Sequence, residues 1–282
     1  MSSHDTAFVL GGGGLLGANE VGMLRALLEE GVRPDLVVGT SVGAINGAAI
    51  AFDPTPAAVA RLTDMWRKVA ESDLYSGSAL RRVGHLARTR THVHPNEPLR
   101  GLLEEQFGIV AIEDLAVPFQ CVAASIERAA EHWFTSGSLV DAVLASTAIP
   151  GVLPPVRIGD EHFLDGGLVN SIPVSRAVTL GASTIYVLQV GRIERPLEVP
   201  RRPWEVATVA FEIARRHRFA HDMTTLPDNV VVHVLPTGAD EPPRHADLSA
   251  LRYRDFSNVQ KRISEAYDAS LAYLRDPNRQ AG

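Results

Sequence analysis

The 282-residue sequence has one cysteine, Cys121, so it cannot form an intrachain disulfide. The thiol falls in the apolar run FQCVAAS, and we expect it to be buried and structural rather than reactive. The ten histidines are scattered, and none stands beside a second ligand pair at the spacing of a zinc site. The sequence therefore gives no indication of a bound metal.

Long apolar runs and excess positive charge are lacking too. The apolar runs fall well short of the roughly 20 residues that cross a bilayer. The first residues, MSSHDTAFVLGGGG, have neither a basic start nor a long apolar segment, so we expect no signal peptide and a cytoplasmic protein. A net charge of −6 argues against nucleic acid as the main partner, because phosphate binding needs a clustered basic surface.

Short β-branched runs alternate with helical periodicity along the chain, which predicts an α/β fold with a mostly parallel sheet. The predicted strands cover 7–10, 36–38, 119–125, 132–135, 162–164, 184–190 and 230–235. The predicted helices include one that ends near 31 and others at 42–51, 56–71, 97–107, 138–145, 174–180, 204–223 and 256–274. The Pro/Gly stretch 146–156 is expected to be irregular. No linker or repeat divides the chain, so 1–282 is predicted to be one domain, with its motifs in about 7–190 and a helix–strand–helix extension at about 200–275.

The most informative motif is a serine between glycines, Gly39-Thr40-Ser41-Val42-Gly43, which ends the buried-strand run LVVG. A nucleophilic serine must project from a sharp strand-to-helix turn, and flanking glycines remove side chains that would block it. The helix that follows also directs backbone N–H groups and its positive dipole end at the reacting atom. An ordinary N-cap serine in a glycine-rich turn fits the same pattern, so both interpretations stay open.

A second Gly-rich turn, from Gly11 to Gly14 with Gly17, follows the first predicted strand. Its backbone N–H groups could form an oxyanion hole. The spacing also matches a dinucleotide fingerprint, but that interpretation requires an acidic residue at the end of the next strand to hold a ribose. Asp35 precedes that strand and Ser41 follows it, so the nucleotide-binding hypothesis lacks this partner. A purely structural glycine turn is a third interpretation.

A serine nucleophile also needs a base, which is usually a histidine. The late histidines lie on an Arg-rich helix, inside a strand or in a polar loop: His217, His221, His233 and His245. Asp165 is a better candidate, because it ends an apolar strand and is followed by Gly166 and Gly167. A free Asp, with a pKa of about 3.9, is a poor base, so it would need a dry site and direct contact with the hydroxyl. An ordinary Asp-Gly turn between strands is the alternative.

Taken together, these motifs resemble one family, the patatin-like phospholipases. Three ordered motifs carry the resemblance: GGGLLG (12–17), GTSVG (39–43) and DGG (165–167). Supporting pieces are VGMLRAL (21–27) and ASTAIPG (145–151). The likeness covers about residues 7–190. It implies a three-layer α/β/α fold and a lipid acyl hydrolase that uses no histidine, metal or organic cofactor.

By that resemblance, Ser41 is the nucleophile and Asp165 the general base of a Ser–Asp dyad. The backbone N–H groups implied for the oxyanion hole are those of Gly12, Gly13, Gly14 and Val42. The glycines implied to support the motifs are Gly17, Gly39, Gly43, Gly166 and Gly167. The implied reaction is hydrolysis of a lipid carboxylic ester, of the phospholipase A, lysophospholipase or esterase type, through an acyl-enzyme on Ser41.

Two positions depart from the family pattern: Leu16 stands where the family usually has arginine, and Glu20 where it often has histidine. If the arginine only supports the loop, activity survives its loss. If it adds positive potential for a phospholipid headgroup, the substrate class changes. A catalytically weak lipid-binding or scaffold relative is therefore one alternative, and a nucleotide-binding protein built on the Gly12–Gly17 loop is a less favoured one.

Two arginine-rich segments bear on surface contacts. Residues 81–94 lie where a variable cap would sit between the catalytic motifs, and their arginines could make a transient contact with an anionic membrane surface. The arginines concerned are Arg81, Arg82, Arg88 and Arg90. A solvated loop is the other interpretation. The Arg215–Arg218 cluster is expected to lie on a solvated helix face.

Overall fold

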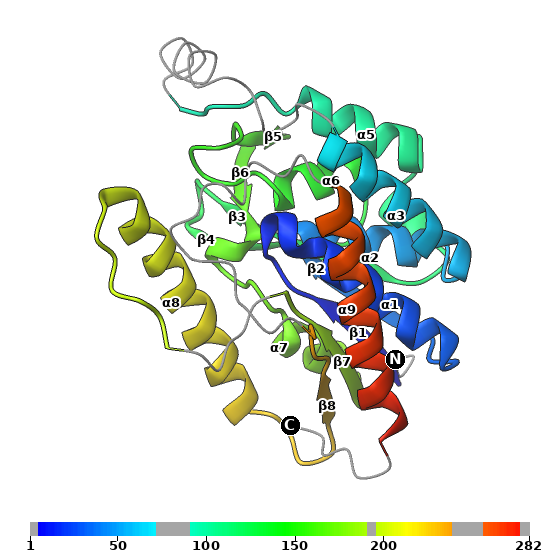
Figure 1. Cartoon of the computed structure of the whole chain (residues 1–282). Helices are drawn as coiled ribbons and strands as arrows, with labels where there is room; N and C mark the ends of the chain where they lie inside the picture. Colours follow the sequence, from blue (N-terminus) through cyan, green and yellow to red (C-terminus); the bar gives the residue numbers. More distant parts are fainter. Residues whose placement is uncertain (1–4, 72–90, 191–195, 239–255, 277–282) are drawn as a thin grey trace.

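The structure is a computed structural model that describes residues 5–71, 91–190, 196–238 and 256–276. An eight-stranded sheet forms its centre in the order β5-β6-β3-β2-β1-β7-β8, and β4 also pairs with β3 (Figure 1). The strands are β1 (Thr6–Leu10), β2 (Leu36–Thr40), β3 (Phe119–Ser125), β4 (Ala130–Phe134), β5 (Val156–Ile158), β6 (Glu161–Asp165), β7 (Thr184–Leu188) and β8 (Val231–Val234).

Helices and short 3-10 turns connect these strands. The helices are α1 (Ala18–Glu29), α2 (Val42–Phe52), α3 (Pro56–Glu71), α5 (Glu97–Phe107), α6 (Leu139–Ser146), α7 (Val174–Thr179), α8 (Pro203–Thr224) and α9 (Phe256–Arg275). The 3-10 turns are η1 (Gly14–Gly17), η2 (Ile112–Asp114) and η3 (Gly166–Leu168). Within the described ranges, no helix has a stretch that is both long and apolar enough to cross a membrane.

The middle of the sheet is parallel and its margin is antiparallel. Every pair along the series β3-β2-β1-β7-β8 is parallel. The pairs β3–β4, β3–β6 and β5–β6 are antiparallel. The parallel strands β1, β2 and β7 are covered on both faces, which explains their continuous apolar runs.

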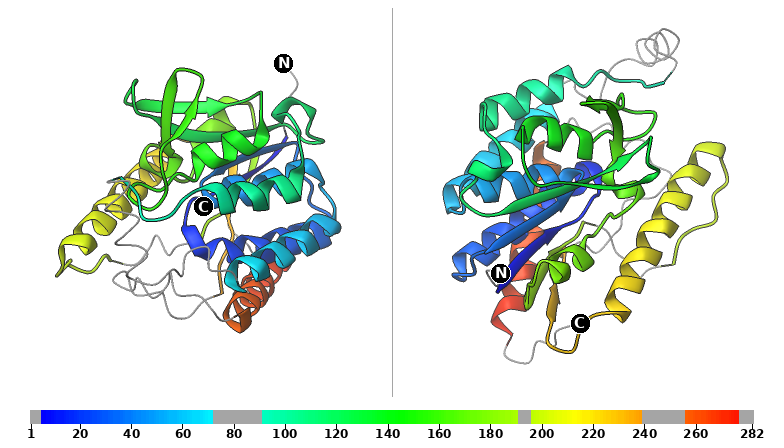
Figure 2. Two further views of the ribbon diagram at one scale, coloured as in Figure 1. Left: turned by 90° about the horizontal axis from the view of Figure 1, so that it is seen from above. Right: turned by 180° about the vertical axis from the view of Figure 1, so that it is seen from behind.

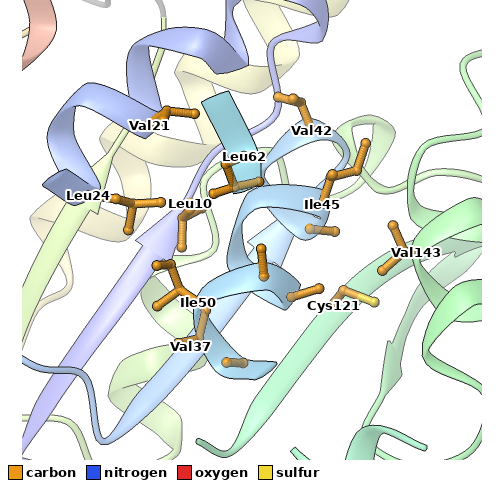
Figure 3. Close-up of a cluster of buried hydrophobic side chains, with 14 of the residues drawn as sticks. Leu10, Val21, Leu24, Val37, Val42, Ile45, Ile50, Leu62, Cys121 and Val143 are labelled. Carbon is orange, nitrogen blue, oxygen red and sulfur yellow. The ribbon is translucent and has the colours of Figure 1, made fainter. Parts of the chain in front are cut away.

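Helices cover both faces of this sheet. On one face, Leu10 and Val37 belong to a cluster that includes side chains of α1, α2 and α3 (Figure 3). On the other face, Val9 packs in a separate cluster with Val174 of α7 and Phe219 of α8. Figure 2 shows α8, in yellow, on the opposite side of the sheet from α1 and α3, in blue and cyan. The predicted three-layer α/β/α architecture with a mostly parallel sheet is therefore confirmed.

The segment after residue 200 continues the same layers. Strand β8 pairs in parallel with β7, and α9 lies along α1. The two helices approach closely at Gly22, where a Cβ atom would lie 2.1 Å from the carbonyl oxygen of Ile263. Burial of Ile263 and Ala266 against α1 accounts for the amphipathic pattern of the last helix.

Most predicted elements are found within a few residues of their expected bounds, and α3, α5 and β3 match them throughout. Strand β5 was not expected, because its three residues follow Pro154 and Pro155 and show no period of their own. Cys121 is buried as predicted, and burial raises the pKa of its thiol. The arginines at 81–90 lie outside the described residues.

Candidate active site

The serine turn connects β2 to α2 through a single residue, Ser41. Its backbone has φ 54° and ψ −123°, in a region that non-glycine residues rarely adopt. Two contacts hold this conformation. The Ser41 N–H donates to Ser146 Oγ at 2.9 Å, and the Ser41 carbonyl oxygen accepts from the N–H of Ala44 at 2.8 Å. The side chain is fixed at the start of α2, where the dipole of the helix is positive.

The glycines on either side of Ser41 allow three backbone segments to touch. A Cβ atom on Gly39 would lie 2.5 Å from the carbonyl oxygen of Gly43, and one on Gly43 would lie 2.3 Å from that of Leu10. The turn is therefore packed directly against the end of β1, with no room for a side chain at either position.

Asp165 reaches Ser41 from the end of β6. Ser41 Oγ donates a 2.6 Å hydrogen bond to Asp165 Oδ2, and the N–H of Gly167 donates to Oδ1 at 2.7 Å. Both side chains are buried, with exposed fractions of 5% for Ser41 and 3% for Asp165. None of the described histidines hydrogen-bonds to either side chain.

The register of β3 explains how residues 124 positions apart meet. Thr40, at the end of β2, pairs with Val122, whereas Asp165 pairs with the next residue, Ala123. Since β4 occupies the opposite edge of β3, strands β2 and β6 pair with consecutive stretches of the same edge of β3. Gly166 lets β6 approach β3 at this point, because a Cβ atom there would lie 2.1 Å from the carbonyl oxygen of Val122.

Burial gives Asp165 the electrostatics of a base. Removal from solvent raises the pKa of its carboxyl to about 6, against the hydrogen bonds from Ser41 and Gly167, which lower it. The carboxylate is therefore a stronger base than a solvated Asp, but still mostly ionised at neutral pH. It is also the hydrogen-bond acceptor of the serine hydroxyl, so proton transfer needs no rearrangement.

The glycine loop (residues 11–17) lies beside the serine turn. A Cβ atom on Gly12 would come 3.4 Å from Ser41 Cβ, and one on Gly17 would come 2.1 Å from Val42 Cγ2. The Gly12 N–H donates to the carbonyl oxygen of Ser171 at 2.8 Å, so it would have to leave that partner to reach an oxyanion.

The next two glycines of the loop present free donors. Among the described residues, none accepts a hydrogen bond from the N–H of Gly13 or Gly14. Gly14 has φ +59°, and no atom of the described residues lies within 4 Å of where its Cβ would stand. A Cβ on Gly13 would instead overlap Val190. The two unpaired N–H groups therefore directly follow Gly12, the residue of the loop that approaches Ser41.

Ser146 is a site residue that the motif analysis missed as a functional group. It is fully buried on α6 and is the acceptor for the Ser41 N–H. A hydroxyl at the end of LVDAVLAS, a helix that is apolar apart from Asp141, was the available signal. The described residues also contain no convergent group of three His, Cys, Asp or Glu side chains that could hold a metal.

A family model described as Patatin-like phospholipase matches residues 8–178 of this chain. The chain belongs to the patatin-like phospholipase family. It is 34% identical over 202 residues to Lysophospholipase NTE1 of Phaeosphaeria nodorum, a stretch that is 69% of this chain and 12% of that relative. It is also 34% identical over 193 residues to Patatin-like phospholipase domain-containing protein 6 of Homo sapiens, covering 68% of this chain and 14% of the relative.

This patatin-like chain thus spans about an eighth of the length of the curated relatives it matches. Among solved structures, VipD from Legionella pneumophila aligns with 96% of this chain and 67% of its own, at 13% identity and a TM-score of 0.45.

Two departures from the patatin-like pattern have defined surroundings here. Leu16 is half-buried in η1, whereas Glu20 is fully buried on α1.

The expectation that Arg215 lies on a solvated face is wrong. Its side chain is on the face of α8 turned toward the sheet, where Nη1 lies 3.1 Å from Glu212 Oε1 and Nη2 donates to Gln189 Oε1 at 3.4 Å.

Proposed function

We propose that this patatin-like protein hydrolyses carboxylic esters of lipids through a Ser41–Asp165 dyad. The observation that carries the proposal is the 2.6 Å hydrogen bond from Ser41 Oγ to Asp165 Oδ2. Family membership and the name lysophospholipase, carried by relatives, support a lipid ester as substrate. The buried setting of the dyad supports a reaction that is protected from bulk water.

In the first half of the reaction, Asp165 accepts the hydroxyl proton while Ser41 Oγ attacks the ester carbonyl carbon. The carbonyl π electrons move onto oxygen and form a tetrahedral oxyanion. When this intermediate collapses, the bond to the alcohol oxygen breaks, and the alcohol leaves with the proton from Asp165. An acyl group stays on Ser41 Oγ.

The oxyanion is assigned to backbone donors on both sides of Ser41. The N–H groups of Gly13 and Gly14 have no acceptor among the described residues, and that of Val42 is at the first position of α2. Gly12 joins them if its N–H leaves the Ser171 carbonyl oxygen. A preorganised donor of this kind is worth about 2.7–4 kcal/mol in the transition state.

In the second half, a water molecule attacks the acyl carbon while Asp165 accepts its proton. Collapse of the second tetrahedral intermediate breaks the bond to Ser41 Oγ, which takes the proton back from Asp165. The fatty acid leaves and the enzyme is restored. One carboxylate therefore serves as base and acid in turn, without a histidine.

The test is covalent labelling with a fluorophosphonate, with the adduct located by mass spectrometry. Wild type should form a stoichiometric adduct on Ser41, and Asp165→Asn should lose it. The same variant should lose turnover of a lysophospholipid and of a p-nitrophenyl ester. Matched controls are Ser138→Ala and Asp160→Asn, because both side chains are exposed and outside the dyad.

Absence of an adduct on correctly folded wild type would refute the proposal. The alternative of a lipid-binding or scaffold relative predicts that outcome together with retained binding of lipid vesicles. An adduct on Ser41 that Asp165→Asn keeps at the wild-type rate would refute the role of the base alone.

A further inference from the structure

A buried polar cluster lies behind the glycine loop and is not used by the proposed reaction. It consists of Glu20 on α1, Asn46 on α2 and Trp66 on α3, and is called here the Glu20 cluster. Glu20 and Asn46 have no exposed surface, and Trp66 is 4% exposed. Asn46 Nδ2 donates to Glu20 Oε2 at 2.8 Å, and Trp66 Nε1 donates to Asn46 Oδ1 at 3.1 Å.

The cluster joins the two Gly-rich turns of the site. Asn46 Nδ2 also donates to the carbonyl oxygen of Gly17 at 2.9 Å, and Gly17 is the last residue of η1. Asn46 stands four residues after Val42, so the two lie one turn apart on the same side of α2. Gly17 itself packs against Val42 and Trp66. One side-chain amide therefore fixes the end of the loop relative to the helix that begins next to Ser41.

Glu20 orients that amide. One Nδ2 hydrogen of Asn46 is donated to the Glu20 carboxyl oxygen, and the second Nδ2 hydrogen is donated to the carbonyl oxygen of Gly17. The Trp66 N–H donates to Oδ1 and so fixes which end of the amide is the oxygen. Simple core filling does not require an acid here, because an apolar residue of similar length avoids the desolvation of a carboxyl group. The second oxygen, Oε1, has no hydrogen-bond partner among the described residues.

Burial around Glu20 favours the neutral form of the acid. Burial raises the pKa of Glu20 well above its usual range, although the hydrogen bond from Asn46, the nearby N–H of Gly11 and the charge of Arg215 lower it. Arg215, on α8, is the charged side chain that acts on Glu20 in the described part of the chain. A raised pKa means that ionisation at higher pH opposes the folded arrangement.

We infer that Glu20 is a positioning residue for ester hydrolysis: through Asn46 it holds the glycine loop against the start of α2, so that the N–H groups of Gly13, Gly14 and Val42 face one oxyanion. The inference rests on the proposed function. The role needs an acceptor oxygen toward Asn46, which a glutamine also provides.

The experiment compares Glu20→Gln with Glu20→Met in the full chain. Met is similar in length and removes a buried acid, but it leaves one Nδ2 hydrogen of Asn46 without its acceptor, so this variant is expected to fold with an unfolding midpoint somewhat below wild type. For p-nitrophenyl butyrate, Glu20→Met should lower kcat about 100-fold with little change in KM, because misplaced donors act in the transition state. Glu20→Gln should stay within about threefold of wild type and keep its pH profile near neutrality.

A second readout follows the loop directly. Amide hydrogen exchange in the peptide covering residues 11–20 should be faster in Glu20→Met and unchanged in Glu20→Gln. The matched control is Glu29, which is exposed at the other end of α1; Glu29→Gln and Glu29→Met should leave kcat and loop exchange as in wild type.

The inference would be overturned if Glu20→Met kept the wild-type kcat and the wild-type rate of loop exchange. It would also be overturned if Glu20→Gln and Glu20→Met lowered kcat equally. Ser41→Ala separates this failure from failure of the proposed function. If Ser41→Ala abolishes turnover while Glu20→Met is unimpaired, only the positioning role is refuted. If Ser41→Ala keeps turnover, the proposed function fails, and loop exchange alone then decides whether Glu20 holds the loop.

Discussion

The serine turn and the glycine loop are both rich in glycine, yet they use it in opposite ways. In the serine turn, Gly39 and Gly43 bring backbone atoms into contact, and the N–H and carbonyl of Ser41 both have partners. In the glycine loop, Gly14 faces open space, and its N–H and that of Gly13 have no described acceptor.

The difference matches two chemical requirements. A nucleophile must stay in one position through the reaction, so its backbone is fully bonded and tightly packed. Oxyanion donors must be oriented but unpaired until charge develops, because a donor that is already bonded adds little to the transition state. Glycine serves the first requirement by close packing and the second by leaving the backbone exposed.

The largest expected effect comes from removing the carboxylate that accepts the Ser41 hydrogen bond, which is the base of the proposed reaction. Asp165→Asn should lower kcat by about four orders of magnitude, as loss of the acid does in other serine hydrolases. In wild type, kcat should rise with pH through about 6, because the base must be ionised and the pKa of Asp165 is about 6. Steady-state hydrolysis from pH 4 to 8 measures both, and a flat wild-type profile would contradict the assignment.

The same group should change folding stability with pH. The pKa of Asp165 is raised from 3.8 to about 6, so the folded state binds this proton more tightly than the unfolded state. The stabilisation that this proton gives the folded state is fully present below about pH 4 and is lost as the pH rises through about 6. The free energy of unfolding should change by about 3 kcal/mol over this range. Urea unfolding of wild type and Asp165→Asn should diverge by that amount between pH 4 and 7. A constant difference would show that burial does not perturb this carboxyl.

The packing of the serine turn can be broken with one methyl group. Gly43→Ala would put a Cβ 2.3 Å from the carbonyl oxygen of Leu10, which forces two backbone segments apart. We expect a loss of about 3 kcal/mol in the free energy of unfolding. Gly101→Ala is the control, because Gly101 lies in α5 with no atom within 4 Å and should gain about 1 kcal/mol. Equal effects at both positions would be inconsistent with a packed turn.

The hydrogen bond from the Ser41 N–H to Ser146 Oγ can be removed by a substitution in α6. Ser146→Ala leaves the buried Ser41 N–H unpaired, which should cost about 2 kcal/mol of stability. Fluorophosphonate labelling should slow about tenfold, because the strained serine is less well fixed. Ser138→Ala, at the N-cap of the same helix, should cost about 1 kcal/mol without slowing labelling. Labelling that is equally fast in both variants would count against the role of Ser146.

The smallest effect is expected at the open end of the glycine loop. The Cβ of Gly14→Ala would meet no atom within 4 Å in the part of the chain that the structure describes, and its cost is the strain of a positive φ, about 1 kcal/mol. The free energy of unfolding should therefore stay within about 1 kcal/mol of wild type, as measured by urea unfolding. A loss as large as that of Gly43→Ala would mean that the two turns do not differ as described.

Local sequence patterns were sufficient to predict most of the helices and strands. Buried parallel strands read as continuous apolar runs, so β1, β2 and β7 were found near their observed bounds. The pairing of β6 with the same edge of β3 as β2 could not be read from the sequence. That pairing depends on register between distant segments, and it is the feature that places Asp165 beside Ser41.

Single polar residues in apolar surroundings were the hardest to interpret. Ser146 and Glu20 look unremarkable in sequence because their partners, the Ser41 N–H and Asn46, come from other elements. Arg215 was misplaced because its three neighbours in the cluster RRHR suggest solvent, whereas the face of α8 is fixed by packing against the sheet. Such residues are defined by tertiary neighbours, which periodicity does not contain.

The close contact between α9 and α1 has a consequence for biosynthesis. Gly22 of α1 rests against the backbone at Ile263, so one side of the helix that follows the glycine loop stays uncovered until residues 256–276 have left the ribosome. The serine turn can form from residues made early, but the helix anchoring the loop gains its last neighbour at the end of this segment. A nascent chain stopped before α9 would therefore hold Ser41 in its turn while the helix after the glycine loop lacked one of its neighbours.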